Sequence, residues 1–252
     1  MDDWPEALEP FRQAPDRSVL IFDYDGTLSP IVTDPSAARP ADGAAELLGA
    51  LAERYRTVAV VSGRSVDFLA QQLPGDLVLS GIYGLERVVN GRRVDHPSVG
   101  AWREVVNDVA ALSEARGPAG MQVESKGLSI TFHYRTHPEL ADEVEAWAQA
   151  QAARSGLERR AAKMSVELHP PVDIDKGTVV AELAADASAV LYAADDLGDL
   201  PAFDALDELA SAGVHVLRVA VVGPEAPSEI VDRADLTVAS NAELVERLTA
   251  LV

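Results

Sequence analysis

Unbroken apolar runs alternate with segments of helical periodicity along most of this 252-residue chain, and no other feature constrains the fold as strongly. A short apolar run is typical of a strand covered on both faces, as in a parallel sheet. We predict strands over residues 19–22, 58–61, 77–79, 189–193, 214–222 and 235–238. Helices are predicted over residues 48–55, 66–73, 176–185 and 200–212. The alternation predicts an α/β fold, a doubly wound, Rossmann-like parallel sheet with helices on both faces.

Local signals predict where several elements begin or turn. Asp42, Ser65 and Asn241 precede or begin helical patterns. Short polar side chains at such positions accept hydrogen bonds from the first N–H groups of a helix, so we predict all three as N-caps. The pair Asn90-Gly91 lies between two short stretches of strand character and predicts a tight hairpin.

A different pattern occupies the middle of the chain. Residues 128–134 and 164–168 alternate between apolar and polar side chains. This alternation is typical of antiparallel strands with one polar face. The helices expected beside them cover residues 102–112 and 139–154. The predicted domains are a core of residues 1–97 and 174–252 and an inserted α+β domain of residues 98–173.

The composition narrows the classes of function. Lys and Arg total 21 against 41 Asp and Glu, a formal net charge of −20, which argues against binding nucleic acid or an anionic membrane. The chain has no cysteine, which excludes disulfides, thiolate metal sites and cysteine nucleophiles. It has neither the ~18-residue apolar run of a membrane span nor a basic, apolar leader. We expect a cytoplasmic protein, by default a monomer, that binds neither nucleic acid nor membrane.

Four polar clusters follow predicted strands or begin predicted helices. In an open parallel sheet the ligand site lies beyond the carboxyl ends of the strands, so these clusters are expected to converge. Alone, each cluster also fits a solvated turn or helix start, and their joint placement is what indicates a site. The clusters are Asp23–Leu28, Ser62–Arg64, Asp175–Gly177 and Asp195–Asp199.

The residue types in these clusters predict phosphoryl transfer. Converging carboxylates repel one another unless a cation lies among them, and oxygen ligands favour Mg²⁺. One such carboxylate can attack phosphorus and form an aspartyl-phosphate. A second carboxylate two residues on, as in Asp23-Tyr24-Asp25, can protonate the leaving alcohol and later accept a proton from water. A hydroxyl and a lysine can bind the phosphate oxygens.

The same motifs carry a resemblance to a known family. They are Asp23-Tyr24-Asp25-Gly26-Thr27-Leu28, Ser62-Gly63-Arg64, Asp175-Lys176-Gly177 and Asp195-Asp196-x-x-Asp199, with Lys126-Gly127-Leu128 and Glu167-Leu168-His169-Pro170 as further marks. In this combination the chain resembles the haloacid-dehalogenase-like (HAD) phosphatases and, more closely, the trehalose-6-phosphate phosphatase family. The resemblance implies a HAD-like core, an inserted cap domain, Mg²⁺ as cofactor and a small sugar phosphate as substrate.

The resemblance implies a role for each matching residue. Asp23 would be the nucleophile and a metal ligand, and Asp25 the general acid and base with its backbone carbonyl on the metal. Ser62 would bind the phosphoryl group, which Lys176 would neutralise. The other implied metal ligands are Asp195, foremost, and Asp196 and Asp199, which the sequence does not rank. The implied substrate-binding residues are Arg64 in the core and Glu124, Lys126 and Glu167 in the cap.

The predicted reaction is hydrolysis of trehalose 6-phosphate, as in trehalose biosynthesis. Another sugar phosphate, such as sucrose phosphate or a hexose phosphate, stays open as the substrate. A metal-dependent glycosyltransferase using Asp23-Tyr24-Asp25 as a D-x-D site is an alternative of another class, although neither standard Gly-rich phosphate loop is present. A phospho-receiver or inactive binding domain is a third. Asp25 argues against it, because a receiver has no leaving alcohol to protonate.

Overall fold

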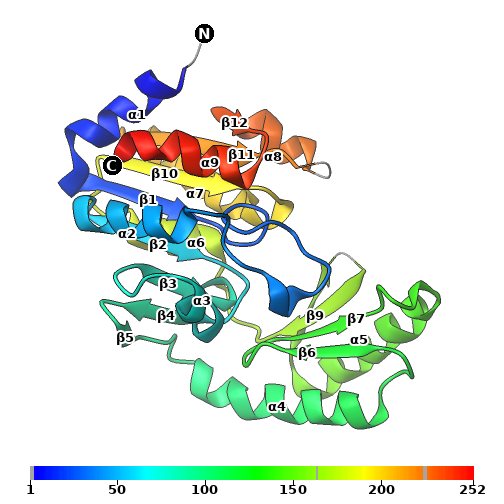
Figure 1. The fold of residues 1–252 in the computed structure, drawn as a ribbon. Helices are drawn as coiled ribbons and strands as arrows, with labels where there is room; N and C mark the ends of the chain where they lie inside the picture. Colours follow the sequence, from blue (N-terminus) through cyan, green and yellow to red (C-terminus); the bar gives the residue numbers. More distant parts are fainter. Residues whose placement is uncertain (1–2, 163, 224–225) are drawn as a thin grey trace. The chain divides into compact units, whose positions relative to one another are not determined.

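The chain folds into two compact units (Figure 1). The computed structural model describes residues 3–162, 164–223 and 226–252. The first unit contains Met1–Val94 and Ile174–Val252, and the second contains Asp95–Asp173. The second unit is therefore a continuous insert that begins at Asp95, three residues before the border that we predicted. Its role as a cap stays a prediction.

The first unit is built on an eight-stranded sheet in the order β12-β11-β10-β1-β2-β3-β4-β5. The first six strands in this order run parallel, and β4 pairs antiparallel with both β3 and β5. The strands are β1 (Ser18–Phe22), β2 (Thr57–Val61), β3 (Val78–Gly81), β4 (Glu86–Val89), β5 (Arg92–Arg93), β10 (Ala189–Ala194), β11 (His215–Val221) and β12 (Leu236–Val238). The strand order reverses between β1 and β10, which confirms the predicted doubly wound sheet and makes this the expected place for a ligand.

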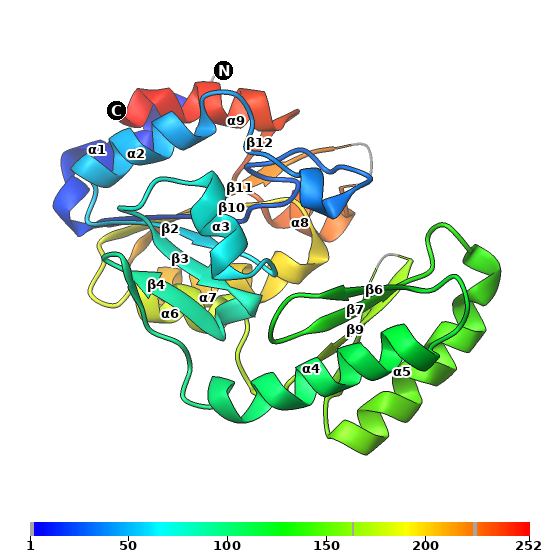
Figure 2. The ribbon, with the colours of Figure 1, turned by 60° about the horizontal axis from the view of Figure 1, so that its bottom comes forward.

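Helices cover both faces of this sheet, because its parallel strands are apolar on both sides. On one face, side chains of α1 (Trp4–Gln13), α2 (Ala44–Arg54), α3 (Val66–Gln72) and α9 (Asn241–Leu248) share a core with Leu20 and Phe22. On the other, α6 (Lys176–Leu183), α7 (Leu200–Ser211) and α8 (Ser228–Arg233) pack against Val19 and Ile21. Figure 2 shows α1, α2 and α9 on one side of the sheet and α6 and α7 on the other. Successive residues of β1 therefore enter two separate cores.

The second unit is a four-stranded antiparallel sheet in the order β6-β7-β9-β8, with two helices on one face. Its elements are β6 (Gln122–Ser125), β7 (Ile130–His133), β8 (Glu158–Ala162), β9 (Ser165–His169), α4 (Val99–Arg116) and α5 (Ala141–Ser155). Phe132 and Val166 pack against the apolar side chains of α4 and α5. The next row across the sheet, Glu124, Thr131, Glu167 and Arg160, is polar. The strands β6 and β8 were not predicted.

Short 3₁₀ turns connect several of these elements. They are η1 (Pro15–Arg17), η2 (Pro35–Ala37), η3 (Ile82–Gly84), η4 (Pro138–Leu140), η5 (Leu197–Asp199) and η6 (Thr249–Leu251). None of the helices within the described ranges has both the length and the apolar character that crossing a bilayer requires.

The structure confirms one predicted N-cap and corrects two. Ser65 accepts a hydrogen bond from the Phe68 N–H, as expected. The prediction for Asp42 was wrong, because Gly43, in the left-handed region at φ 80°, occupies the N-cap position of α2. The prediction for Asn241 was also wrong, because the Ser240 side chain caps α9 instead. The hairpin is confirmed. Asn90 and Gly91 have φ values of 50° and 69°, and a two-residue type I′ turn requires a positive φ at both positions.

Candidate active site

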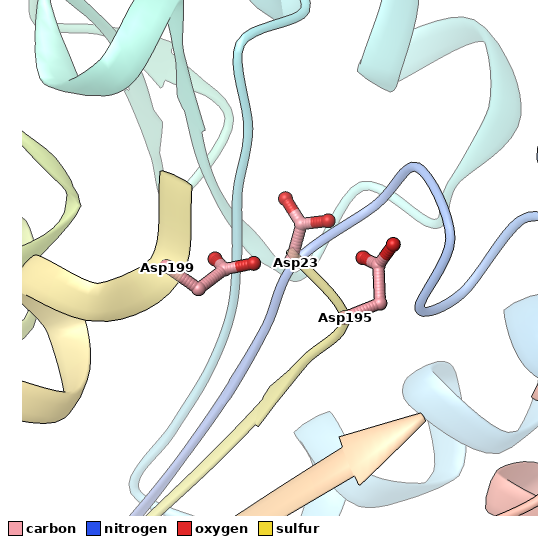
Figure 3. A group of neighbouring side chains, drawn as sticks. All are labelled: Asp23, Asp195 and Asp199. Carbon is pink, nitrogen blue, oxygen red and sulfur yellow. The ribbon is translucent and has the colours of Figure 1, made fainter. Parts of the chain in front are cut away.

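Three carboxylates meet beyond the carboxyl ends of β1 and β10. The two strands pair in parallel with Phe22 opposite Ala193, so Asp23 and Asp195 follow at neighbouring positions. Asp199 comes from the η5 turn. One oxygen from each of Asp23, Asp195 and Asp199 lies within 4.8 Å of the other two. Figure 3 shows the three side chains grouped together, with that of Asp199 pointing toward Asp23. The predicted convergence beyond the carboxyl ends of the strands is therefore present for these three residues.

Lys176 joins this group as its cation. Its Nζ donates to Asp23 Oδ1 and to Asp199 Oδ1, both at 2.6 Å, and its side chain is buried. Lys176 is the first residue of α6, whose start is fixed by Asp175 accepting from the Thr178 N–H. Burial opposes the charge of Lys176, but the charges of Asp199 and Asp23 raise the pKa of Lys176 well above its usual value. The lysine is therefore held charged between two carboxylates.

The carboxylates outnumber this single lysine. Burial raises the pKa of Asp23 well above its usual value against the opposing charge of Lys176, and the charges of Asp199 and Asp195 raise it further. Burial, then the charges of Asp199 and Asp196, raises the pKa of Asp195 to about 7. A divalent cation among these oxygens would relieve the repulsion. The site fits such an ion, because Asp199 Oδ2 is buried with no hydrogen-bond partner in the described structure.

The structure distinguishes Asp199 from Asp196, which the sequence did not. Asp199 is fully buried and belongs to the carboxylate group. Asp196 lies outside that group, and its Oδ1 accepts a hydrogen bond from the Gly198 N–H at 2.8 Å. This bond caps the η5 turn that carries Asp199. Asp196 therefore supports the turn, and its role as a metal ligand stays a prediction.

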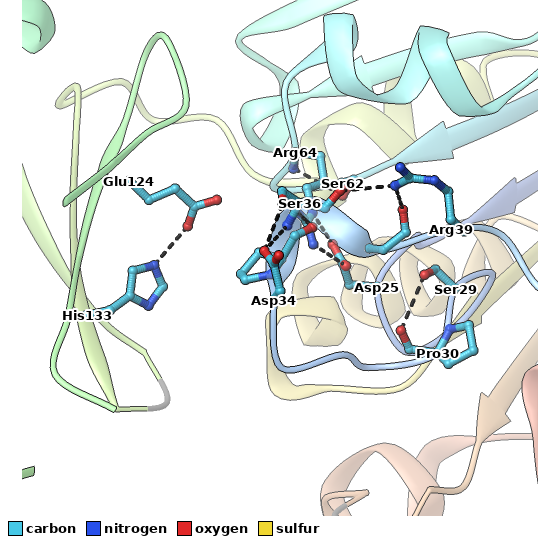
Figure 4. A network of polar contacts seen from close by, with 12 residues as sticks. Asp25, Ser29, Pro30, Asp34, Ser36, Arg39, Ser62, Arg64, Glu124 and His133 are labelled. Atoms are coloured by element: carbon cyan, nitrogen blue, oxygen red, sulfur yellow. Dashed lines mark hydrogen bonds and ion pairs between the residues drawn. The ribbon is translucent and has the colours of Figure 1, made fainter. Parts of the chain in front are cut away.

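Asp25 is held by Arg64. The Nε and Nη2 atoms of Arg64 donate to the two carboxylate oxygens of Asp25, each at 2.7 Å (Figure 4). Arg64 also donates from Nη1 to the Pro35 carbonyl and lies 4.6 Å from the centre of the Phe68 ring. We expected Arg64 to face the substrate. In the structure its guanidinium group binds the predicted acid through two hydrogen bonds, and its role toward the substrate stays a prediction.

Ser62 follows β2 and is almost fully buried. Its Oγ accepts from the Arg64 N–H at 3.1 Å, which leaves its own O–H group able to donate to a phosphoryl oxygen. The backbone beside it is strained, because Ile82 and Tyr83 have φ values of 47° and 56°. Their N–H groups donate to the carbonyls of Arg64 and Ser62. Strain of this kind is concentrated at functional sites in proteins.

The three predicted sugar-binding residues of the insert belong to the second unit. Glu167 is buried on β9 and accepts from the Ser129 hydroxyl at 2.6 Å, and the Lys126 Nζ lies 3.8 Å from the same carboxylate. Glu124 Oε2 lies 2.9 Å from His133 Nε2 (Figure 4). His133 is half-buried and paired with Glu124. Together these groups form a polar surface on the sheet side opposite α4 and α5.

Three residues of the core bind the carboxylate group or its loop without having been predicted to do so. The hydroxyl of Tyr192, on β10, donates to Asp199 Oδ1 at 2.6 Å. Thr27 Oγ1 donates to Asp195 Oδ1 at 3.0 Å. Asn241 donates from Nδ2 to two carbonyls of the loop that follows Asp23. A tyrosine within an otherwise aliphatic strand is the one sequence signal that could have identified Tyr192.

We expect the metal-free protein to lose stability as the pH rises from about 4 to about 7. The pKa of Asp195 is raised to about 7 in the folded state, so the unfolded chain binds fewer protons across this interval. The free energy of unfolding then falls with pH, by up to about 1.4 kcal/mol per pH unit for one group. Urea denaturation in a chelator at several pH values measures this slope.

Two controls test the origin of this pH dependence. Asp195→Asn removes the titrating group and should flatten the slope. Saturating Mg²⁺ should also flatten it, because the carboxylates then bind the cation in place of protons. A metal-free wild-type protein whose stability rises over the same interval would contradict the assignment.

Comparison with known proteins agrees with the geometry. The sequence model of the trehalose-phosphatase family matches residues 21–235. A trehalose-phosphate phosphatase of Mycobacterium ulcerans is 34% identical over 224 residues, which cover 82% of this chain and 57% of that protein. The C-terminal domain of the trehalose-6-phosphate phosphatase of C. albicans has 25% identity and a TM-score of 0.76, over 99% of this chain and 96% of that chain. A sugar phosphatase of HAD subclass IIB shares the fold at 14% identity, with a TM-score of 0.51, over 93% of this chain and all of that one.

The family match includes every segment that supplies the carboxylate group and Lys176. The chain spans a little more than half the length of the M. ulcerans relative. The match to the family model extends over most of the chain, and the identity to the relative exceeds 30%. This chain is therefore a member of the trehalose-phosphatase family.

Proposed function

We propose that this chain is a Mg²⁺-dependent phosphatase that hydrolyses trehalose 6-phosphate to trehalose and phosphate. The observation that carries the proposal is the meeting of Asp23, Asp195 and Asp199 at the switch point of the sheet, in a chain of this family. Lys176 forms ion pairs with Asp23 and Asp199. The relative from M. ulcerans carries the name of a trehalose-phosphate phosphatase. A site of this composition supplies a nucleophile, a cation and a place for a metal.

In the proposed reaction Asp23 is the nucleophile. Its Oδ1 is bonded to Lys176, so Oδ2 attacks phosphorus and forms an aspartyl-phosphate while the bond from phosphorus to the sugar oxygen breaks. Asp25 gives a proton to that leaving oxygen. In the second step Asp25 takes a proton from water, the water oxygen attacks phosphorus, and Asp23 is released together with inorganic phosphate. The acid role requires one carboxyl oxygen of Asp25 to carry a proton and to face the leaving sugar oxygen.

The other groups of the site would bind charge. Ser62 and Lys176 would donate to the phosphoryl oxygens, whose charge is redistributed during transfer. Asp23, Asp195 and Asp199 are the side chains that would hold the Mg²⁺ ion, and the backbone carbonyl of Asp25 is a further candidate. Bound there, the ion would supply positive charge to the phosphoryl group. Oxygen ligands without sulfur or nitrogen favour Mg²⁺ over zinc or copper.

A panel of phosphate esters tests the proposal directly. We expect kcat/KM for trehalose 6-phosphate to exceed that for glucose 6-phosphate and sucrose 6-phosphate by at least about tenfold, since polar sites built to read hydroxyl groups discriminate strongly. A chelator should abolish turnover, and Mg²⁺ should restore it. Equal rates on the three sugar phosphates would reject the assigned substrate, and turnover that is indifferent to the chelator would reject the metal.

We expect Glu167→Ala to affect the sugar substrate selectively. The buried carboxylate of Glu167, next to Lys126 and Ser129, is proposed to bind sugar hydroxyls, so its loss should lower kcat/KM for trehalose 6-phosphate by about 10²-fold. Hydrolysis of a small aryl phosphate should be unchanged. Glu104→Ala, at an exposed position on α4, is the matched control. Equal losses on both substrates would count against a sugar-binding role.

A further inference from the structure

The side chain of Asn241 serves the candidate site and not its own helix. Asn241 is the first residue of α9, but the N-terminus of that helix is capped by Ser240, which accepts from the Glu243 N–H. The Nδ2 group of Asn241 donates instead to the carbonyls of Gly26 and Thr27, at 2.6 and 2.8 Å. These two residues lie more than 200 positions earlier in the chain. One amide group thus binds two successive peptide units of the loop that follows Asp23.

The loop bound by Asn241 packs directly against Asp195. Thr27 is fully buried, and its hydroxyl donates to Asp195 Oδ1 at 3.0 Å. Gly26 has a φ of 87°, and a Cβ atom on it would lie 1.8 Å from Asp195 Oδ2. The backbone of Gly26 therefore lies against one carboxylate oxygen while Thr27 binds the other. A small displacement of this loop would either push the carboxylate or release it.

These contacts form one connected path. It runs from Asn241 on α9 to the carbonyls of Gly26 and Thr27, and from Thr27 to the carboxylate of Asp195. Asp195 belongs to the group that fits a divalent cation. Groups that bind and orient metal ligands contribute to metal affinity without touching the metal, and their loss typically costs 10- to about 100-fold.

We propose that Asn241 is a positioning residue that fixes the loop of Gly26 and Thr27 and, through it, the orientation of Asp195 toward the cation. This role deepens the proposed function and rests on it, because it assumes that Asp195 is a ligand of Mg²⁺. It requires no contact between Asn241 and the substrate. Loss of the amide should therefore reduce the free energy of Mg²⁺ binding by more than it reduces the free energy of unfolding.

The test compares Mg²⁺ binding by wild-type protein, Asn241→Ala and Asn241→Asp, each freed of metal and titrated by calorimetry. We expect Asn241→Ala to weaken Mg²⁺ binding about tenfold. Asn241→Asp should weaken it further, because a carboxylate in place of the amide faces two carbonyl oxygens and repels them. Ser240→Ala is the matched control on the adjacent residue. It should lower the melting temperature by loss of the cap and leave Mg²⁺ affinity unchanged.

A second variant keeps the test decisive if Asn241→Ala folds poorly. Thr27→Val removes only the hydroxyl that binds Asp195 and should also weaken Mg²⁺ binding. If the path is real, the two substitutions together should weaken binding by less than the product of their separate effects, because they interrupt the same connection. Multiplicative effects, or Asn241→Ala binding Mg²⁺ within about twofold of wild type, would overturn the proposal.

Failure of the positioning role of Asn241 can be distinguished from failure of the proposed phosphatase function. A wild-type protein that binds Mg²⁺ and hydrolyses no trehalose 6-phosphate would reject the substrate and leave the role of Asn241 standing. Variants of Asn241 that match wild type in Mg²⁺ affinity would reject that role and leave the phosphatase standing. A wild-type protein that binds no Mg²⁺ would reject both.

Discussion

Replacing Asp23 with asparagine should lower kcat for phosphate ester hydrolysis by at least about 10⁴-fold, while the metal-free protein becomes no less stable. Loss of a covalent nucleophile removes the first bond-forming step, and comparable losses in other enzymes reach about 10⁶-fold. The effect on stability has a separate cause. Asp23 is buried beside Asp195 and Asp199 with one lysine between them, so a neutral amide relieves repulsion in the folded state. Rates and thermal unfolding in a chelator measure the two effects.

The control for this variant is the same substitution at an exposed position. Asp76 lies before β3, at the opposite end of the strand from the candidate site, and its side chain is exposed. Asp76→Asn should change neither turnover nor stability. A fully active Asp23→Asn protein would eliminate the covalent mechanism. A large loss of stability in the chelator would show that the carboxylates do not repel one another as the geometry indicates.

Replacing Lys176 with methionine should have the largest effect on stability. The substitution leaves the buried carboxylates of Asp23 and Asp199 without the cation that bonds to both at 2.6 Å. Removing one partner of a buried ion pair typically costs about 3–5 kcal/mol of unfolding free energy. We expect a loss of this size near neutral pH in the absence of metal, together with loss of turnover. Denaturant titration with and without Mg²⁺ measures it.

The double variant Lys176→Met, Asp199→Asn isolates the cause of that loss. If the instability comes from uncompensated carboxylates, neutralising one of them should recover part of the stability of the single variant. Acidification should also reduce the deficit, because protonated carboxylates need no cation. A double variant less stable than Lys176→Met alone would show that packing of the lysine stem, and not charge, stabilises this part of the core.

The parallel core could be predicted from the sequence because its strands are continuous apolar runs. The side chains of Val190 and Leu191 lie in the cores on opposite faces of the sheet. Such a strand is apolar at every position and can be identified without knowing which strands pair with it. The strands β6 and β8 offered no such signal. Gln122–Ser125 contains one apolar residue, and Glu158–Ala162 begins with three charged ones. Both are formed by pairing with β7 and β9, and a single strand of polar sequence does not reveal its neighbour.

The candidate site could be predicted in outline and not in its connections. Asp23 and Asp195 follow adjacent strands, and the sheet rule alone brings them together. The pairing of Arg64 with Asp25 joins two residues that lie 39 positions apart, one after β1 and one after β2. Asn241 was assigned to the wrong partner because it stands next to Ser240, and local preferences allow either residue to cap a helix. Which of the two residues caps α9 is decided by the packing of this helix beside the loop of Gly26 and Thr27, whose carbonyls bind Asn241.

The division of the chain into two units places the proposed reacting groups and the proposed sugar-binding groups in different segments of the gene. The groups proposed to break the phosphate ester, Asp23, Asp25, Ser62 and Lys176, all belong to the first unit, whereas Glu124, Lys126 and Glu167 come from the continuous stretch Asp95–Asp173. Substitution, duplication or recombination within that stretch leaves every proposed reacting group in its original segment. Mutations in this stretch can therefore change which substrate is bound while the groups proposed to cleave the phosphate ester are kept. A laboratory chimera that exchanges this stretch between relatives would change the same part of the chain.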